Sequence, residues 1–199
     1  MRCCTWKKEG IDYMSPIKTI VTATVVGCLA FASETACTGE SKGEPSSKSL
    51  SERISSEGAR QVLSKLMASE TQWKGLRIEI ANGKQDSLVA GMTLYLSADA
   101  GAKEMLGHSF GEALKPAASK VLELAKRNNL PMSELCQSPD VDDDRFNSYD
   151  RSVQEIAKRK QAVEAISQSS LSGERSACLA ALESAAGSLA RFFGVEAGK

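Results

Sequence analysis

The chain has 199 residues, of which 42% are apolar, and its 25 Lys and Arg residues balance its 25 Asp and Glu residues. This balance excludes the cationic surplus with which nucleic-acid-binding proteins neutralise phosphates, and the acidic bias that keeps chains disordered. A single histidine, His108, leaves little scope for imidazole catalysis or for zinc binding.

The first apolar segment follows Lys18 and runs without a charge from Thr19 to Ala32. Its 14 residues are too few to span a bilayer as a helix, which takes about 20 residues. The length is typical of a secretory signal, and Ala30-Phe31-Ala32 provides the small residues that precede a cleavage site. We predict that residues 1–32 are a leader cut between Ala32 and Ser33. A membrane anchor or a buried helix is the alternative.

Two features leave the processing of this leader open. Met14 precedes Ser-Pro-Ile-Lys and is an alternative start of the chain. Val25-Val26-Gly27-Cys28 resembles a bacterial lipobox, in which Cys28 would become a lipidated N-terminus. The apolar run before Cys28 is short and continues beyond it, which favours simple cleavage. Either route predicts a periplasmic or secreted protein, with a lipid anchor to the bacterial envelope as the alternative to a free form.

Without the leader, 21 basic residues face 23 acidic ones, so the net charge becomes −2 and no nucleic-acid partner is expected. Residues 38–56 contain seven serines, and Leu50 and Ile54 are their only aliphatic residues. Such a stretch buries too little surface to offset its ordering entropy. We therefore predict a flexible tether over 33–56, one helical domain over 57–193 and a disordered tail over 194–199.

The domain shows helical periodicity, with apolar residues three and four positions apart. Its apolar stripes are, in chain order, Val62–Met67, Trp73–Ile80, Leu88–Leu96, Met105–Leu114, Val121–Leu124, Tyr149–Ile166 and Leu171–Phe192. Asp99 and Pro116 are suited to begin helices and Gly83 to end one. The alternation over 76–80 also fits a strand, but the helical patterns on both sides favour a helix. The predicted fold is all-α, an orthogonal or HEAT-like stack of about six to seven helices with one disulfide.

Some of these residues also form a loose pattern over about a third of the chain. They are Trp73, Gly83, Leu96, Asp99-Ala100-Gly101, Leu106, Ala113-Leu114, Val121-Leu122 and Cys136. The pattern resembles small secreted or periplasmic helical proteins of bacteria whose function is unknown. The resemblance implies a helical secreted domain and carries over no catalytic residue. Independently of it, an aromatic residue at helical spacing such as Trp73 is expected in the core.

The sequence Gly107-His108-Ser109-Phe110-Gly111 matches the G-x-S-x-G nucleophile elbow of hydrolases. That elbow needs a strand before the serine and a histidine elsewhere in the chain, whereas both flanks here are helical and the single histidine adjoins the serine. We expect instead that Gly107 and Gly111, on one helical face, let another helix approach closely. His108 is then a partly exposed polar residue.

Asp140, Asp142 and Asp144 have the 1-3-5 spacing of a calcium loop. The remaining pattern fails, because Arg145 stands where the loop needs glycine and Arg151 where it needs a bidentate glutamate. The three residues are a weak calcium candidate, and a solvated acidic loop is the favoured interpretation. The basic run Lys158-Arg159-Lys160 is likewise expected to be solvated.

Cys136 and Cys178 are the predicted disulfide, because both lie in the folded part of a chain expected in an oxidising compartment. Closing a loop of about 43 residues stabilises a fold by about 4 kcal/mol in the chain-entropy model. The alternatives are that one of them pairs with Cys37 or that each is simply buried. Cys37 then pairs with another chain or stays free.

The predicted function is that of an exported, non-catalytic helical protein that binds a protein or cell-envelope partner, with no cofactor. One alternative is an immunity-type inhibitor of a toxin that acts in the periplasm. Another is a hydrolase that uses carboxylates alone, such as Asp140 to Asp144 with Glu134. The acids lie in a loop where no apolar pocket is evident to raise one pKa, which disfavours this alternative.

Overall fold

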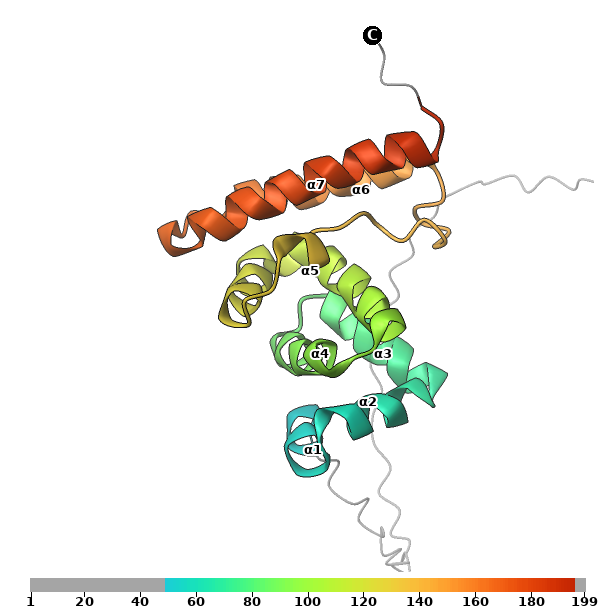
Figure 1. The fold of residues 1–199 in the computed structure, drawn as a ribbon, viewed down its shortest axis with the longest axis vertical. Helices are drawn as coiled ribbons and strands as arrows, with labels where there is room; N and C mark the ends of the chain where they lie inside the picture. Colours follow the sequence, from blue (N-terminus) through green and yellow to red (C-terminus); the bar gives the residue numbers. More distant parts are fainter. Residues whose placement is uncertain (1–48, 196–199) are drawn as a thin grey trace, which may run out of the picture. The chain divides into compact units, whose positions relative to one another are not determined.

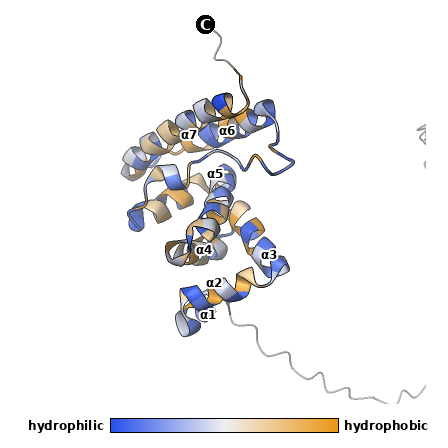
Figure 2. Ribbon diagram, turned by 45° about the vertical axis from the view of Figure 1, so that its right-hand side comes forward, coloured by the Kyte–Doolittle hydropathy of each residue, from blue (hydrophilic) through white to orange (hydrophobic). Residues whose placement is uncertain are grey.

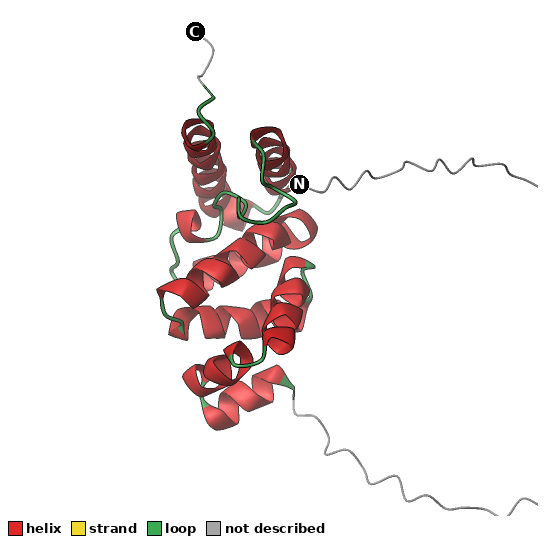
Figure 3. Cartoon of the chain, turned by 90° about the vertical axis from the view of Figure 1, so that its right-hand side faces the viewer, coloured by secondary structure: helices red, strands yellow, loops and turns green. Residues whose placement is uncertain are grey.

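The computed structural model describes residues 49–195. The predicted leader and cleavage site, Cys28 and Cys37 lie outside these residues. The helices are α1 Leu50–Glu57, α2 Ala59–Met67, α3 Glu70–Ala81, α4 Gln85–Ser97, α5 Ala100–Arg127, α6 Tyr149–Glu164 and α7 Ser172–Phe192, with 3₁₀ turns η1 Met132–Glu134 and η2 Ser169–Leu171. Figure 3 shows helices joined by loops, with no strand in the described part. The predicted all-α class is confirmed, and residues 76–80 are helical.

The helices are stacked in chain order, from α1 and α2 at one end to α6 and α7, which lie side by side, at the other (Figure 1). Helices α3, α4 and α5 form the middle of this stack. Several helices in Figure 2 carry hydrophilic and hydrophobic residues together, as expected where a helix buries one side. The core includes Ile80, Leu106, Phe110, Leu122 and Leu182, each no more than 2% exposed.

Helix α1 corrects the predicted boundary of the domain, because residues from Leu50 onward are helical rather than part of a tether. Ser49 caps the helix: its hydroxyl accepts a hydrogen bond from the amide of Glu52, and the Glu52 carboxylate accepts one from the amide of Ser49. Leu50 and Ile54 pack against the core. The serine content favoured a tether, but Ser49-x-x-Glu52 is the signature of a capping box.

Helix α5 contains the break that Pro116 predicts. The backbone of Ala117 has φ −145° and ψ 36°, so α5 bends there and then continues to Arg127. Asp99 caps its start, as predicted, by accepting a hydrogen bond from the amide of Ala102 at 2.9 Å. Gly83, with φ 73°, follows α3 and packs against the bend. A Cβ at Gly83 would lie 2.9 Å from the Cβ of Ala117, so the turn after α3 needs glycine for space as well as for conformation.

The predicted disulfide is present between Cys136, just after η1, and Cys178 in α7. Both residues are buried. The bridge ties α7 to the segment that leaves α5, across a sequence separation of 42 residues.

A buried charge network lies where α5 meets α6. Arg159 is fully buried, and its Nε donates to a carboxylate oxygen of Glu155 at 3.2 Å. Its Nη1 donates to the backbone oxygen of Gln137 at 3.0 Å. Lys115 of α5 lies 2.7 Å from the same Glu155 oxygen. The expectation of a solvated basic run is therefore wrong for Arg159, whose chain neighbours Lys158 and Lys160 stay near the surface.

Opposing effects set the pKa of Glu155. Burial raises this pKa, but the hydrogen bond from Lys115 and the charges of Arg159 and Lys115 outweigh burial, so the pKa lies below its ordinary value. Burial lowers the pKa of Arg159, which nevertheless stays charged at neutral pH. Near neutral pH the Glu155 carboxylate is therefore ionised and lies between the two cations Lys115 and Arg159.

The disulfide predicts a redox-dependent stability. Cys136→Ala should lower the free energy of unfolding by about 4 kcal/mol in non-reducing buffer, because the unfolded chain loses its crosslink. In strong reductant the two proteins should melt at similar temperatures. Thermal denaturation measures both, and Cys37→Ala is the control that should melt like the wild type. Equal melting of Cys136→Ala and the wild type in non-reducing buffer would contradict a stabilising bridge.

The network predicts acid sensitivity. Because the folded-state pKa of Glu155 is lowered, its carboxylate stabilises the fold above the unfolded-state value of about 4.3. This contribution is lost as the pH falls from there through the folded-state pKa. Glu155→Gln should lower the unfolding free energy at neutral pH by about 3 kcal/mol and flatten its decline in acid. Urea titrations over a pH series measure this, with the exposed Glu164→Gln of the same helix as the control.

Candidate functional site

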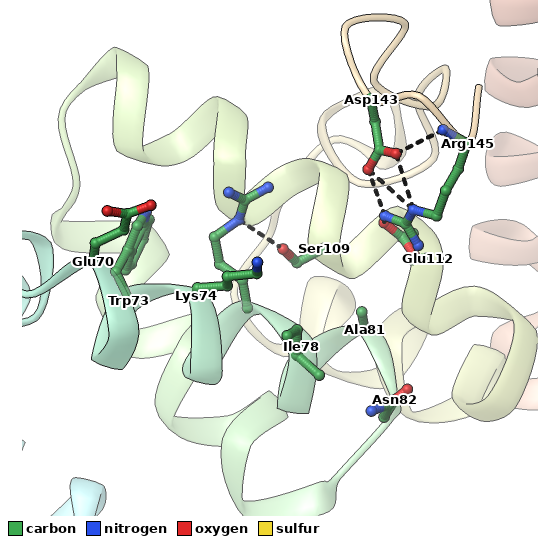
Figure 4. Close-up of a pocket in the computed structure, with 11 residues that line it drawn as sticks. Glu70, Trp73, Lys74, Ile78, Ala81, Asn82, Ser109, Glu112, Asp143 and Arg145 are labelled. Carbon is green, nitrogen blue, oxygen red and sulfur yellow. Dashed lines mark hydrogen bonds and ion pairs between the residues drawn. The ribbon is translucent and has the colours of Figure 1, made fainter. Parts of the chain in front are cut away.

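A cleft of about 340 Å³ lies between α3, the middle of α5 and the loop that connects η1 to α6 (Figure 4). Trp73, Lys74 and Arg77 line it from α3; we call these three residues the donor wall. Glu112 of α5 with Asp143 and Arg145 of the loop form the facing side, which we call the paired wall. Segments far apart in sequence thus bring three cations and several acids to one cavity.

The charged side chains of the paired wall form hydrogen bonds with one another. Arg145 reaches both oxygens of Glu112, each at 2.9 Å, and both oxygens of Asp143 at 2.7 to 3.1 Å. Its guanidinium also lies 4.9 Å from the ring centroid of Phe146. The hydrogen bond from Arg145 holds the pKa of Asp143 below its ordinary value. All four carboxylate oxygens of this wall therefore already accept hydrogen bonds.

Several hydrogen-bond donors of the donor wall have no acceptor among the described residues. Trp73 is 8% exposed, and its indole Nε1 is buried without a partner among the described residues. Arg77 uses one N–H, on Nε, in a long hydrogen bond of 3.5 Å to the hydroxyl of Ser109. Within residues 49–195, Lys74 forms no ion pair. Because positions four apart share a helix face, Trp73 and Arg77 lie on the same side of α3.

The G-x-S-x-G sequence is not a nucleophile elbow. It lies inside α5, and the hydroxyl of Ser109 donates to the backbone oxygen of Met105 at 3.0 Å. His108 is half-buried on the same helix, and its Nδ1 has no partner in the described part of the chain. This geometry does not place a base against Ser109.

The two glycines of this sequence serve close packing, as predicted, although a loop and a side chain approach them rather than a helix. A Cβ at Gly107 would lie 2.4 Å from the Gln137 side chain. A Cβ at Gly111 would lie 2.7 Å from Nη1 of Arg159 and 3.3 Å from the backbone oxygen of Leu135. Gly111 thus makes room for the buried guanidinium.

The structure does not assemble the calcium candidate. Among the described residues, no three His, Cys, Asp or Glu side chains are placed to hold a metal ion. Asp140 accepts a hydrogen bond from the amide of Asp142, and Asp144 supplies a backbone oxygen to Arg151. The loop is half-exposed and acidic, and its neighbour Asp143 is the residue that lines the cleft.

Glu134, which the hydrolase alternative combines with Asp140 to Asp144, is engaged elsewhere. It accepts a hydrogen bond of 2.6 Å from the hydroxyl of Tyr95. Burial, together with this bond, raises the pKa of Tyr95 above its ordinary value. Glu134 therefore links η1 to α4, and it does not line the cleft.

Trp73 is buried, as its spacing predicts, but sequence analysis missed its place beside a cleft. A tryptophan and an arginine four apart on a helix were a usable signal for the donor wall. No signal in the sequence indicated that Glu112 pairs with Arg145, because 33 residues separate them and tertiary packing sets the path of the loop.

Comparisons with known proteins find no matching family model, no similar curated protein and no similar solved structure. Within residues 49–195, no helix has the length and hydropathy needed to cross a membrane. The functional argument therefore rests on the chemistry of the cleft.

The glycine contacts predict opposite effects of two alanine substitutions in helices. Gly111→Ala should destabilise the protein by about 1–3 kcal/mol, because the new methyl group displaces Arg159 or the Leu135 carbonyl. Gly75→Ala should stabilise it by up to about 1 kcal/mol, since a Cβ there meets nothing within 4 Å. Urea denaturation of both variants measures the difference. A stabilising Gly111→Ala would contradict the close approach.

Proposed function

We propose that this chain is an exported, non-catalytic helical protein that binds a protein or cell-envelope partner through the cleft between α3, α5 and the acidic loop. The observation that carries the proposal is the donor wall, whose Trp73 and Arg77 hold unused hydrogen-bond donors beside an open cavity. The buried, unpartnered indole N–H of Trp73 costs free energy in the isolated protein, and a ligand that accepts from it recovers that free energy.

Export is supported by the leader-like segment Thr19–Ala32 and by the disulfide between Cys136 and Cys178. Disulfides persist in oxidising compartments and are rare in the cytosol. The proposed location is therefore periplasmic or secreted, with lipid attachment at Cys28 as the alternative form.

Binding is favoured over catalysis by the state of the acidic and nucleophilic groups. Glu112 and Asp143 are both ion-paired with Arg145, and the pKa of Asp143 lies below its ordinary value, so Asp143 is not poised as a general acid. The hydroxyl of Ser109 is used within α5. What remains available at the cleft is a set of donors, which suits recognition.

A photo-crosslinking residue at two exposed apolar positions tests this proposal in cells that express the full chain. Ile78 lines the cleft and is 49% exposed, whereas Leu96 of α4 is 45% exposed and lies outside it. We expect a discrete crosslinked partner from position 78, recovered outside the cytoplasm and lost when Arg77→Gln is added. Position 96 should not give this species.

Mass spectrometry of the crosslinked product identifies the partner and the mature N-terminus, which we expect to be Ser33 or lipidated Cys28. Identical products from positions 78 and 96, or products unaffected by Arg77→Gln, would contradict binding at the cleft. Recovery of the protein with its leader intact in the cytoplasm would contradict export.

A further inference from the structure

We propose that the donor wall binds a carboxylate group presented by a peptide segment of the partner. This inference rests on the proposed function and names the chemical group that the cleft recognises. Figure 4 shows the residues concerned, with Trp73 and Lys74 on α3 and Asp143 and Arg145 on the opposite side of the cavity.

The first argument is the mismatch between donors and acceptors in the cleft. On the paired wall, both oxygens of Glu112 and both of Asp143 already accept hydrogen bonds from Arg145. On the donor wall, both Nη groups of Arg77 and the Nε1 of Trp73 have no acceptor among the described residues. A group that fits this cavity must therefore supply acceptor oxygens and needs few donors of its own.

The second argument is the burial of Trp73. Its side chain is more than nine-tenths buried, yet Nε1 has no partner in the part of the chain that the structure describes. Buried indole N–H groups usually have an acceptor, so an orphan beside a cavity marks a place for one. A carboxylate has two oxygens, and these suit the planar fork of Arg77 together with the neighbouring indole N–H.

The third argument is charge, which favours a carboxylate over a phosphate. The paired wall holds two carboxylates and one arginine, and with Lys74, Arg77 and Glu70 the whole lining has three cations and three acids, so no net positive charge attracts a multiply charged anion. A phosphate group carries about −1.5 to −2 charges and would leave more negative charge uncompensated in this cavity than a singly charged carboxylate.

The apolar part of the lining indicates what carries the carboxylate. The Trp73 ring, Ile78 and Ala81 line the cavity beside the donors. An aliphatic side chain next to the charge would bury apolar surface there. A peptide C-terminus with an apolar last residue has this form, and so does an internal Asp or Glu flanked by an apolar residue. Both present the same carboxylate chemistry.

The indole N–H of Trp73 reports binding directly by NMR. The full chain has two tryptophans, and Trp6→Phe leaves Trp73 as the single indole signal. The probes are acetyl-Ala-Ala-Leu with a free C-terminus, the same peptide as its amide, acetyl-Ala-Glu-Leu amide, and inorganic phosphate. We expect the free acid to shift the Trp73 signal and its amide to leave it unchanged. A shift with the Glu peptide shows that an internal carboxylate is also accepted.

Variants separate specific binding from general charge attraction. Arg77→Gln should weaken binding of the free-acid peptide by about tenfold or more, because a charge-assisted pair is lost. Arg127→Gln removes an exposed cation outside the cleft and should leave affinity unchanged. Should Arg77→Gln fail to fold, the exposed Lys74→Gln provides the second measurement, with a weakening of several-fold.

Three results would overturn the inference: no shift of the Trp73 signal with either carboxylate peptide, a shift with phosphate alone, or equal affinity in Arg77→Gln and Arg127→Gln. These outcomes differ from failure of the proposed function. If position 78 crosslinks to a partner but carboxylate peptides cause no shift, the proposed partner binding is supported and carboxylate recognition is rejected. If carboxylate peptides bind but no partner crosslinks at the cleft, carboxylate recognition is supported and the proposed partner binding is rejected.

Discussion

The arrangement of the cleft depends on one buried cation. Arg159 is fully enclosed between α5 and α6, where Glu155 and the backbone oxygen of Gln137 hold it. Removing a guanidinium from water is costly, and these partners compensate it only in part, because Nη2 has none among the described residues. The compensation fixes the start of the acidic loop at Gln137, and it requires Gly111 to lack a side chain. The loop that carries Asp143 and Arg145 is thereby directed along α5.

The two sides of the cleft have opposite chemical states. On the loop side, Arg145 donates hydrogen bonds to the carboxylates of both Glu112 and Asp143, and these bonds fix the positions of the three side chains. On the α3 side, the Nε1 of Trp73 and the Nη groups of Arg77 have no acceptor among the described residues. Preorganised donors on a helix lose little entropy when a ligand arrives. This asymmetry is the physical basis for treating the cleft as a recognition site.

The helices were largely predictable because their signals are local. Apolar periodicity, the Asp99 cap, the glycine after α3 and the break at Pro116 each depend on a few neighbouring residues. Helix α1 was missed although Ser49 and Glu52 spell a capping box, because seven serines in the surrounding stretch favoured disorder. The predicted disulfide needed only the count of cysteines in the folded region and an expected compartment.

The cleft was not predictable, for a reason that lies in its construction. Its walls come from three segments, and the Glu112–Arg145 pair forms only after the loop docks on α5. Charge patterns in the sequence pointed to Asp140, Asp142 and Asp144, whereas the residue that lines the cavity is Asp143 between them. A basic run likewise gave no sign that Arg159 turns inward. Local patterns describe helices well, but they do not say which side chains meet across them.

The position of the disulfide affects how this protein would respond to a protease. The acidic loop, with its exposed Asp142 and Asp144, lies between Cys136 and Cys178 in sequence. A single cut there would divide the chain, yet the bridge would still hold the two fragments in one molecule. Such a nicked form would keep nearly its original mass until it was reduced. The paired wall of the cleft would gain free chain ends while its facing helix stayed covalently attached.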